Sequence, residues 1–157
     1  MSDACVLILA AGLSRRMRAR NRLLLPVVVV TGHQAGAVKA SPDGSTAQAM
    51  FNPDFSQGQP ISASCGLSKA EDGRGILIGL GDQTSQTSDG LRTLRGAPAA
   101  ANSARISIAM HKAQPGNPIV VPAALKARLL AYPRSPGCKK FPCENSDALT
   151  SSLEAIL

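Results

Sequence analysis

The sequence predicts an α/β fold with a mostly parallel sheet and helices on both of its faces. Three observations support it: short runs of apolar, β-forming residues recur along the chain, helical patterns separate several of them, and no internal repeat or linker interrupts the alternation. Strands that alternate with helices favour parallel pairing, because each helix carries the chain back across the sheet. At 157 residues the chain most simply forms one domain, residues 1–157, with a substantial core.

The expected strands are runs without breakers. Residues 4–10 (ACVLILA) and 27–32 (VVVVTG) have the composition of strands buried on both faces. Further strands are expected over residues 49–52, 75–82, 104–110 and 117–122.

The expected helices follow amphipathic or capping patterns. Residues 122–131 (PAALKARLLA) are the clearest, with proline in the first turn and an apolar stripe formed by Leu125, Leu129 and Leu130. Further helices are expected over residues 61–71, over 87–96 with Gly96 as its end, and over 151–157.

Composition excludes several classes of protein. The longest apolar run, residues 23–30, is much shorter than the roughly 20 residues that span a bilayer. The first ten residues contain Asp3 and no basic segment, so we expect no signal peptide and a cytoplasmic location. The four cysteines show no CxxC spacing, so reduced, buried thiols are expected rather than a zinc site or a disulfide framework.

The formal net charge of +7 is concentrated in one place. Five arginines fall within eight positions: Arg15, Arg16, Arg18, Arg20 and Arg22. A local excess indicates an anion site more than a generally basic surface, although arginines that simply solvate a helix face are the alternative. With no tryptophan and 3% aromatic residues, the chain offers little for stacking on bases, so a nucleic-acid partner is not expected.

The loop after the first expected strand has the chemistry of a phosphate site. Small residues follow the strand (Ala10, Ala11, Gly12), and backbone N–H groups that open a helix there can cradle phosphate oxygens. The missing Gly-Lys-Ser/Thr ending excludes a Walker loop. Ligands of parallel sheets lie beyond the carboxyl ends of strands, where Asp82 also falls. Asp82 is therefore a candidate ligand for a phosphate-bound divalent cation, or else a helix cap.

The segment LILAAGLSRRM resembles the signature of the MobA-like nucleotidyltransferases, and most closely of the molybdenum cofactor cytidylyltransferases. VVVVTGHQAGAV, NPDFSQGQ with Ser62 after it, ILIGLGDQ and GNPIVVPAAL follow in the family's order. The resemblance implies a Rossmann-like three-layer sandwich. It also implies Mg²⁺-dependent transfer of a nucleoside monophosphate, here CMP from CTP, to a molybdopterin-type cofactor with release of pyrophosphate.

The resemblance also implies a role for particular residues. Those that would wrap the nucleotide are Ala10, Ala11, Gly12 and Leu13, with Arg15 and Arg16 on the triphosphate. Asp82 would ligate Mg²⁺, and Ser62 and Asn117 would face the acceptor. Arg22 occupies a catalytic position where the family has lysine, and Ala11 stands where guanylyl relatives have glycine. His33 is a candidate for ligand contact or for a structural role, and the family position favours the latter.

Some positions depart from the family pattern: Arg18 replaces glycine, Thr84 replaces proline, Pro60 and Ile61 replace small or hydroxyl residues, and the acidic C-terminal segment is unrecognisable. Three functions therefore stay open. They are cytidylyl transfer to a molybdopterin-type cofactor, transfer to another phosphorylated acceptor, and non-catalytic delivery of cofactor to a molybdoenzyme or its chaperone.

Residues 11–26 alone separate the first two expected strands and must also form the phosphate loop. A parallel crossover needs about a dozen residues including a helix. We therefore expect the natural polypeptide to carry further residues between Pro26 and Val27.

Overall fold

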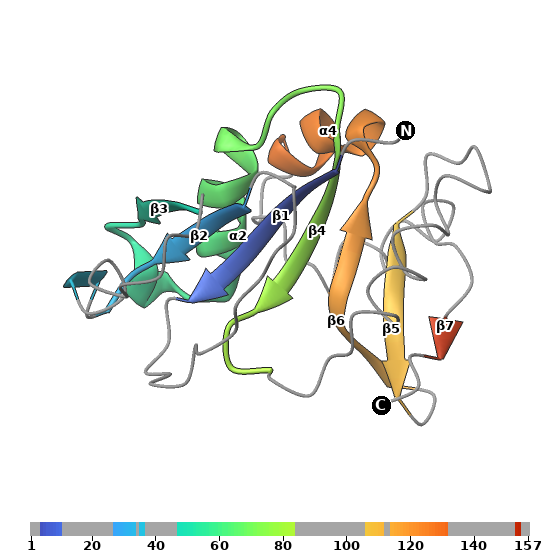
Figure 1. Cartoon of the computed structure of the whole chain (residues 1–157), viewed down its shortest axis with the longest axis horizontal. Coiled ribbons are helices and arrows are strands. Elements are labelled where there is room, and N and C mark those ends of the chain that lie inside the picture. The colour runs from blue at the N-terminus through green and yellow to red at the C-terminus, as the bar shows by residue number, and fades with distance from the viewer. Residues whose placement is uncertain are drawn as a thin grey trace.

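The computed structural model describes residues 4–10, 27–33, 35–36, 47–83, 106–111, 114–131 and 153–154. Within these residues, seven strands form one sheet in the order β3-β2-β1-β4-β6-β5-β7 (Figure 1). The strands are β1 (Ala4–Ala10), β2 (Val27–Thr31), β3 (Gln48–Phe51), β4 (Gly75–Leu80), β5 (Ser107–His111), β6 (Gln114–Val121) and β7 (Leu153–Glu154).

The centre of the sheet is parallel. Strand β1 pairs in parallel with β2 on one side, Leu7 opposite Val28, and with β4 on the other, Leu7 opposite Ile78. Strand β3 continues the parallel arrangement beyond β2, whereas β6 runs antiparallel to both β4 and β5. The mostly parallel, Rossmann-like α/β fold expected from the sequence is confirmed.

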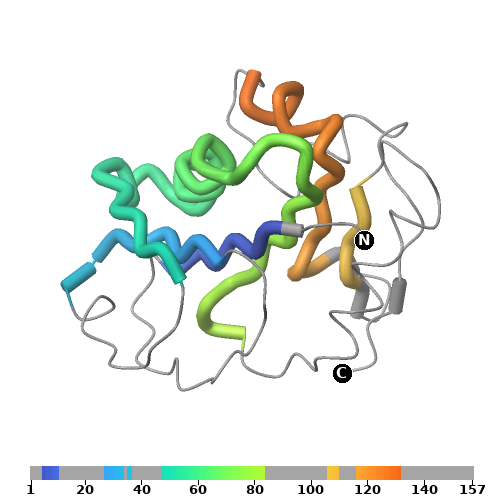
Figure 2. The backbone as a smooth tube through the Cα atoms, turned by 45° about the horizontal axis from the view of Figure 1, so that its top comes forward, coloured from blue at the N-terminus to red at the C-terminus, as the bar shows by residue number. Residues whose placement is uncertain are grey.

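Four helical elements have both ends within the described residues: η1 (Phe55–Gln57), α2 (Gln59–Lys69), η2 (Ala123–Leu125) and α4 (Lys126–Leu130). Ala35 and Gly36 are helical as well. Helices α2 and α4 lie on the same side of the sheet (Figure 2). Helix α2 begins two residues before the expected start, because Gly58 turns the chain with a φ of +107° and Pro60 suits a first helical turn. The helix expected over 122–131 is present, but its first turn is 3₁₀.

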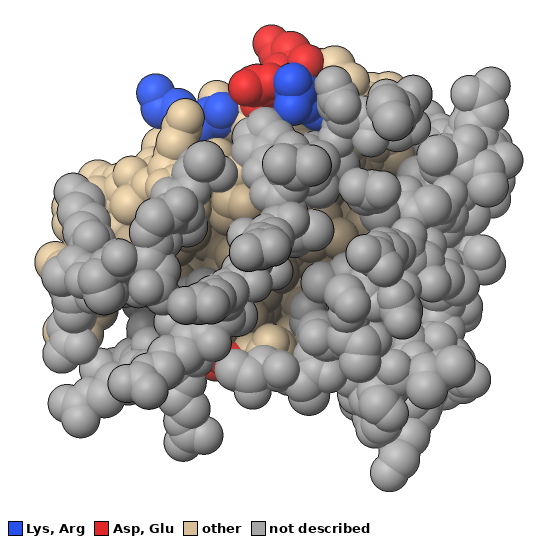
Figure 3. Space-filling view, in the orientation of Figure 1, with Lys and Arg blue, Asp and Glu red and all other residues tan. Residues whose placement is uncertain are grey.

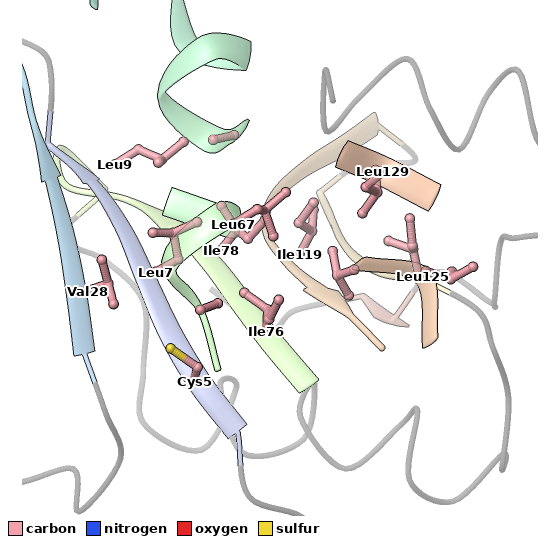
Figure 4. Packing of buried hydrophobic residues seen from close by; sticks show 14 of the residues in the cluster. Cys5, Leu7, Leu9, Val28, Leu67, Ile76, Ile78, Ile119, Leu125 and Leu129 are labelled. Carbon is pink, nitrogen blue, oxygen red and sulfur yellow. The ribbon is translucent and has the colours of Figure 1, made fainter. Parts of the chain in front are cut away.

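Both faces of the central strands are buried. On the face toward α2 and α4, Leu7, Leu67 and Ile78 have no exposed surface (Figure 4). On the opposite face, Val29 and Leu77 are also buried. A sheet covered on both sides explains why β1, β2 and β4 read as continuous apolar runs rather than as alternating patterns.

The expected C-terminal helix is wrong. Leu153 and Glu154 form β7 and pair in parallel with Ala109 and Met110 of β5. The free edge of β5 offers backbone partners that a seven-residue helix in isolation lacks, since such short helices are marginal in water.

Two expectations fall outside the described residues and stay predictions: the helix over 87–96 and the further residues between Pro26 and Val27. The organisation as one domain also stays a prediction. Among the described residues, no helix is long and apolar enough to cross a membrane.

Candidate functional site

The carboxyl ends of β1 and β4 lie in direct contact and form the base of the candidate site (Figure 1). The N–H of Gly81 donates a 3.0 Å hydrogen bond to the carbonyl of Leu9. A methyl group on Gly81 would lie 3.4 Å from the Cα and the Cβ of Ala10, so the backbone after β4 packs tightly against the last residue of β1. The structure thus places Ala10 beside the residue that precedes Asp82.

Asp82 is presented to solvent by a turn. The N–H of Gln83 donates a 3.2 Å hydrogen bond to the carbonyl of Leu80 and so closes a four-residue turn just beyond β4. Asp82 lies in this turn and is exposed. Within the part of the chain that the structure describes, no three His, Cys, Asp or Glu side chains converge to hold a metal. A single carboxylate suits Mg²⁺ that is held mainly by substrate phosphates and water. The Asp82 carboxylate therefore fits a cation held mainly by substrate phosphates.

Asn117 belongs to the same edge of the sheet. Strand β6 is antiparallel to β4, with Ile119 opposite Ile78. Extending this register by two residues places Asn117, which is half-buried, opposite Leu80. The structure therefore brings Ala10, Asp82 and Asn117 to one edge, on three neighbouring strands.

Ser62 lies inside the protein rather than on its surface. It has no exposed area, and its hydroxyl accepts a 3.0 Å hydrogen bond from Nδ2 of Asn52. This partner gives Ser62 a structural role, because it joins the first turn of α2 to the residue after β3. Contact between Ser62 and an acceptor stays a prediction.

Asn52 is the residue that sequence reasoning missed. It is 2% exposed, and besides its bond to Ser62 its Oδ1 accepts from the N–H of Asp54 at 3.0 Å. Its own N–H donates to the carbonyl of Thr31 at 2.8 Å. Asn52 thereby ties the end of β2, the loop after β3 and helix α2 together. An asparagine before proline at a strand end was the available signal, since asparagine readily bonds to the backbone two residues on.

The loop that follows is ordered by short-range contacts. Oδ1 of Asp54 accepts a 3.0 Å hydrogen bond from Nε2 of Gln57 across the 3₁₀ turn. The ring of Phe55 in this turn lies 6.1 Å, centroid to centroid, from the ring of His33 after β2, tilted by 54°. His33 thus has a ring partner within the protein, and both its structural role and a contact with ligand stay predictions.

Six expected nucleotide-site residues lie outside the described residues: Ala11, Gly12, Leu13, Arg15, Arg16 and Arg22. Their contacts with phosphate and base stay predictions.

The described cysteines are free thiols, as expected. Cys5 is buried in β1 and Cys65 is half-buried in α2. Burial raises the pKa of both thiols, which keeps them protonated and weakly nucleophilic. Arg74 and Lys126 act in the opposite direction on the pKa of Cys5, and Lys69 on that of Cys65, but burial outweighs them.

Most of the charged side chains coloured in Figure 3 gather at the opposite end of β4, over the connection from α2, and acidic surface also shows at the other end. Nζ of Lys126 donates to the carbonyl of Ala70 and, at 2.6 Å, to Asp72. Arg74 pairs with Glu71 at 2.9 Å. This cluster joins α2 to α4 and lies away from Asp82, so we assign it to stability.

The fold is that of a mostly parallel α/β protein, a class in which ligands bind at the carboxyl edge of the sheet. The MobA-like NTP transferase domain model matches residues 25–147, more than half of the sequence, and the chain belongs to that family. The matched range begins after the arginine cluster. No curated protein matches the chain.

Solved structures share the fold at low identity. A nucleotidyl transferase from Methanothermobacter is 22% identical with a TM-score of 0.73, over 99% of this chain and 88% of that one. Rv0371c of Mycobacterium tuberculosis H37Rv, in complex with manganese, is 16% identical with a TM-score of 0.69, over 98% and 89%. Molybdopterin-guanine dinucleotide biosynthesis protein A from Archaeoglobus fulgidus is 14% identical with a TM-score of 0.52, over 80% and 72%.

Proposed function

We propose that this protein transfers CMP from CTP to the phosphate of a molybdopterin-type cofactor and releases pyrophosphate. The observation that carries the proposal is the junction of β1 and β4, where Ala10 packs against Gly81 beside the exposed Asp82. A nucleoside triphosphate on the loop after Ala10 would have its phosphates next to that carboxylate. Membership of the NTP transferase family supports the same reaction class.

In the proposed reaction, an oxygen of the acceptor phosphate attacks the α-phosphorus of CTP. The bond between the α-phosphorus and the bridging oxygen breaks, and pyrophosphate leaves with the electron pair. The acceptor phosphate is already ionised near pH 7, so the step needs alignment and charge stabilisation rather than a strong base. Arg15 and Arg16 would stabilise charge on the leaving phosphates, with Arg22 near the α-phosphate.

A divalent cation, when bound, would supply positive charge that neutralises the phosphates, and Asp82 is the residue that would hold it. We propose Mg²⁺ as the physiological ion, and the manganese complex of the mycobacterial structure is consistent with a divalent-cation requirement.

The choice of substrates rests on two features. Ala11 occupies the position at which guanylyl relatives carry glycine, which favours CTP over GTP. The name of the Archaeoglobus protein, with its reference to molybdopterin, supports a pterin acceptor. Asn117 lies at the edge where that acceptor would approach, and Ser62, buried in the first turn of α2, would act through its hydrogen bond to Asn52.

Transfer of the product to a molybdoenzyme or its chaperone in the cytoplasm completes the proposal. Arg22 and Thr84, which depart from the family pattern, favour a second candidate, in which the protein binds and delivers the cofactor without catalysis.

The test is pyrophosphate release from CTP, GTP, ATP and UTP with Mg²⁺, each with and without molybdopterin. We expect release with CTP and molybdopterin together. Pyrophosphate release that requires another phosphorylated compound in place of molybdopterin would change the proposed acceptor and leave the proposed type of reaction unchanged. Tight binding of molybdopterin without any pyrophosphate release would favour the delivery function.

A further inference from the structure

Ring side chains are rare in this protein, and three of them gather at one corner of the site. The chain has three phenylalanines, one tyrosine, two histidines and no tryptophan. His33 follows β2, Phe51 ends β3, and Phe55 lies in the 3₁₀ turn after β3. All three therefore lie at the carboxyl ends of parallel strands, the edge that also carries Ala10 and Asp82.

Two of these rings form a pair that solvent can reach. His33 is exposed and Phe55 is half-buried, and their ring centroids are 6.1 Å apart with a tilt of 54°. This separation lies within the range of 4.5–7 Å in which aromatic rings attract each other. Phe51, which is 49% exposed, lies nearby on the edge strand but is not part of the ring pair.

The order of the strands sets the position of the ring pair relative to the phosphates. In the order β3-β2-β1-β4-β6, the ring pair lies on the β2–β3 side of β1, and Asn117 lies on the β6 side. Adjacent strands are about 4.8 Å apart, so the β3 end is roughly 10 Å from the end of β1. In a nucleotide, the ribose separates the base from the phosphates by a distance comparable to this spacing between the ends of β1 and β3. A nucleotide whose acceptor approaches from β6 would extend its base toward β2 and β3.

The loop that holds Phe55 is fixed before any ligand binds. Asn52 is almost fully buried and bonds to Ser62, to the N–H of Asp54 and to the carbonyl of Thr31. Asp54 in turn accepts from Gln57, which closes the turn around Phe55. A ring held in this way loses little conformational freedom when a flat ligand stacks on it.

We propose that the base of the bound nucleotide stacks on the ring of Phe55 with the tilted ring of His33 against its edge, so that the two rings form a platform for the base, and that Asn52 is the positioning residue that holds Phe55 in place. The proposal rests on the proposed function, because it requires a nucleotide at the β1–β4 junction. The class of ligand is set by the rings themselves, since every nucleobase has a π-face that can stack.

The experiment compares two ligands, CTP and inorganic tripolyphosphate, which keeps the phosphates and lacks the base. Phe55→Leu retains an apolar side chain of similar size and removes the ring, whereas Phe55→Tyr keeps the ring. Phe51→Leu is the matched control, because it removes an exposed ring outside the pair. Dissociation constants are measured by calorimetry, and thermal melting establishes that each variant is folded.

Stacking on one base is worth about 1–3 kcal/mol, so Phe55→Leu is expected to weaken CTP binding about 5- to 150-fold. Its affinity for tripolyphosphate should stay within about twofold of wild type, because the phosphates do not touch the platform. Phe55→Tyr and Phe51→Leu should each bind CTP within about twofold of wild type. If Phe55→Leu does not fold, His33→Leu removes the other ring and is expected to show the same selective loss of CTP affinity.

Unchanged CTP affinity in Phe55→Leu would overturn the platform, and so would an equal loss for CTP and tripolyphosphate. A wild-type protein that binds tripolyphosphate as tightly as CTP would overturn the platform while leaving the phosphate site in place. A wild-type protein that binds neither ligand would overturn the proposed function and the platform with it.

Discussion

Gly66 allows α2 to approach the sheet closely, and Gly66→Ala tests that approach. An added methyl group would lie 2.2 Å from Cδ1 and 2.8 Å from Cδ2 of Leu7, and 2.8 Å from Cγ2 of Val30. Carbon atoms pack best at about 3.5–4.0 Å, so the overlap exceeds 1 Å by a rough measure. Leu7 and Val30 are both at 0% exposure and belong to the same buried cluster, in which Figure 4 shows Leu7.

Two opposing effects decide the magnitude. Alanine inside a helix is favoured over glycine by about 0.8–1.0 kcal/mol. Overpacking a well-filled core costs about 1–3 kcal/mol, and the size of this overlap indicates the upper part of that range. We therefore expect Gly66→Ala to lower the free energy of unfolding by about 2 kcal/mol. For a chain of this length the melting temperature would fall by about 4–8 °C.

Urea unfolding followed by circular dichroism measures this effect. Ser68→Ala on the same helix is the control: Ser68 is exposed and its hydroxyl donates only to the carbonyl of Cys65, so a change within about 0.5 kcal/mol is expected. In a Leu7→Ala background the new methyl group would occupy vacated space. The double variant should therefore lose less free energy of unfolding than the sum of the two single variants. A stabilised Gly66→Ala protein would refute the close contact between α2 and β1.

Three further outcomes are expected. Asp82→Asn should lower Mg²⁺-dependent pyrophosphate release by about 100-fold or more and leave the melting temperature unchanged, since Asp82 is exposed; retained activity would make it a helix cap. Asn52→Ala should cost about 1–3 kcal/mol in urea unfolding, because the buried Ser62 hydroxyl loses its donor, and adding Ser62→Ala should cost little more. Lys126 holds the pKa of Asp72 below its ordinary value of 3.8, so their ion pair stabilises the fold above that pH and is lost as the pH falls through the lowered pKa. The free energy of unfolding of Asp72→Asn should therefore be lower than that of wild type at pH 6, and the two values should converge in acid.

The sequence predicted those parts of the fold in which burial dominates. β1, β2 and β4 are packed on both faces, so their apolar runs mark their position within one or two residues. The C-terminal segment was misread because pairing of Leu153 with Ala109 depends on a strand edge more than forty residues away, which no local pattern reveals. The hairpin of β5 and β6 is local by contrast, because only two residues separate these strands, and both were expected from their apolar runs.

For the site, the rule that ligands lie at the carboxyl edge of parallel strands correctly brought Ala10 and Asp82 together. The resemblance implied that Ser62 faces the acceptor, and this stays a prediction; the structure adds that its hydroxyl points inward to Asn52. Asn52 was missed because the sequence showed it only as the last residue of the expected strand over 49–52, and its partners Ser62 and Thr31 lie elsewhere in the chain.

The most direct test of the account is a crystal structure of the protein with CTP and Mn²⁺, in which anomalous scattering locates the metal. The account predicts Mn²⁺ bound to the Asp82 carboxylate, the triphosphate against the backbone after Ala10, and the base on the β2–β3 side of the sheet. Manganese and nucleotide bound away from the β1–β4 junction would contradict it.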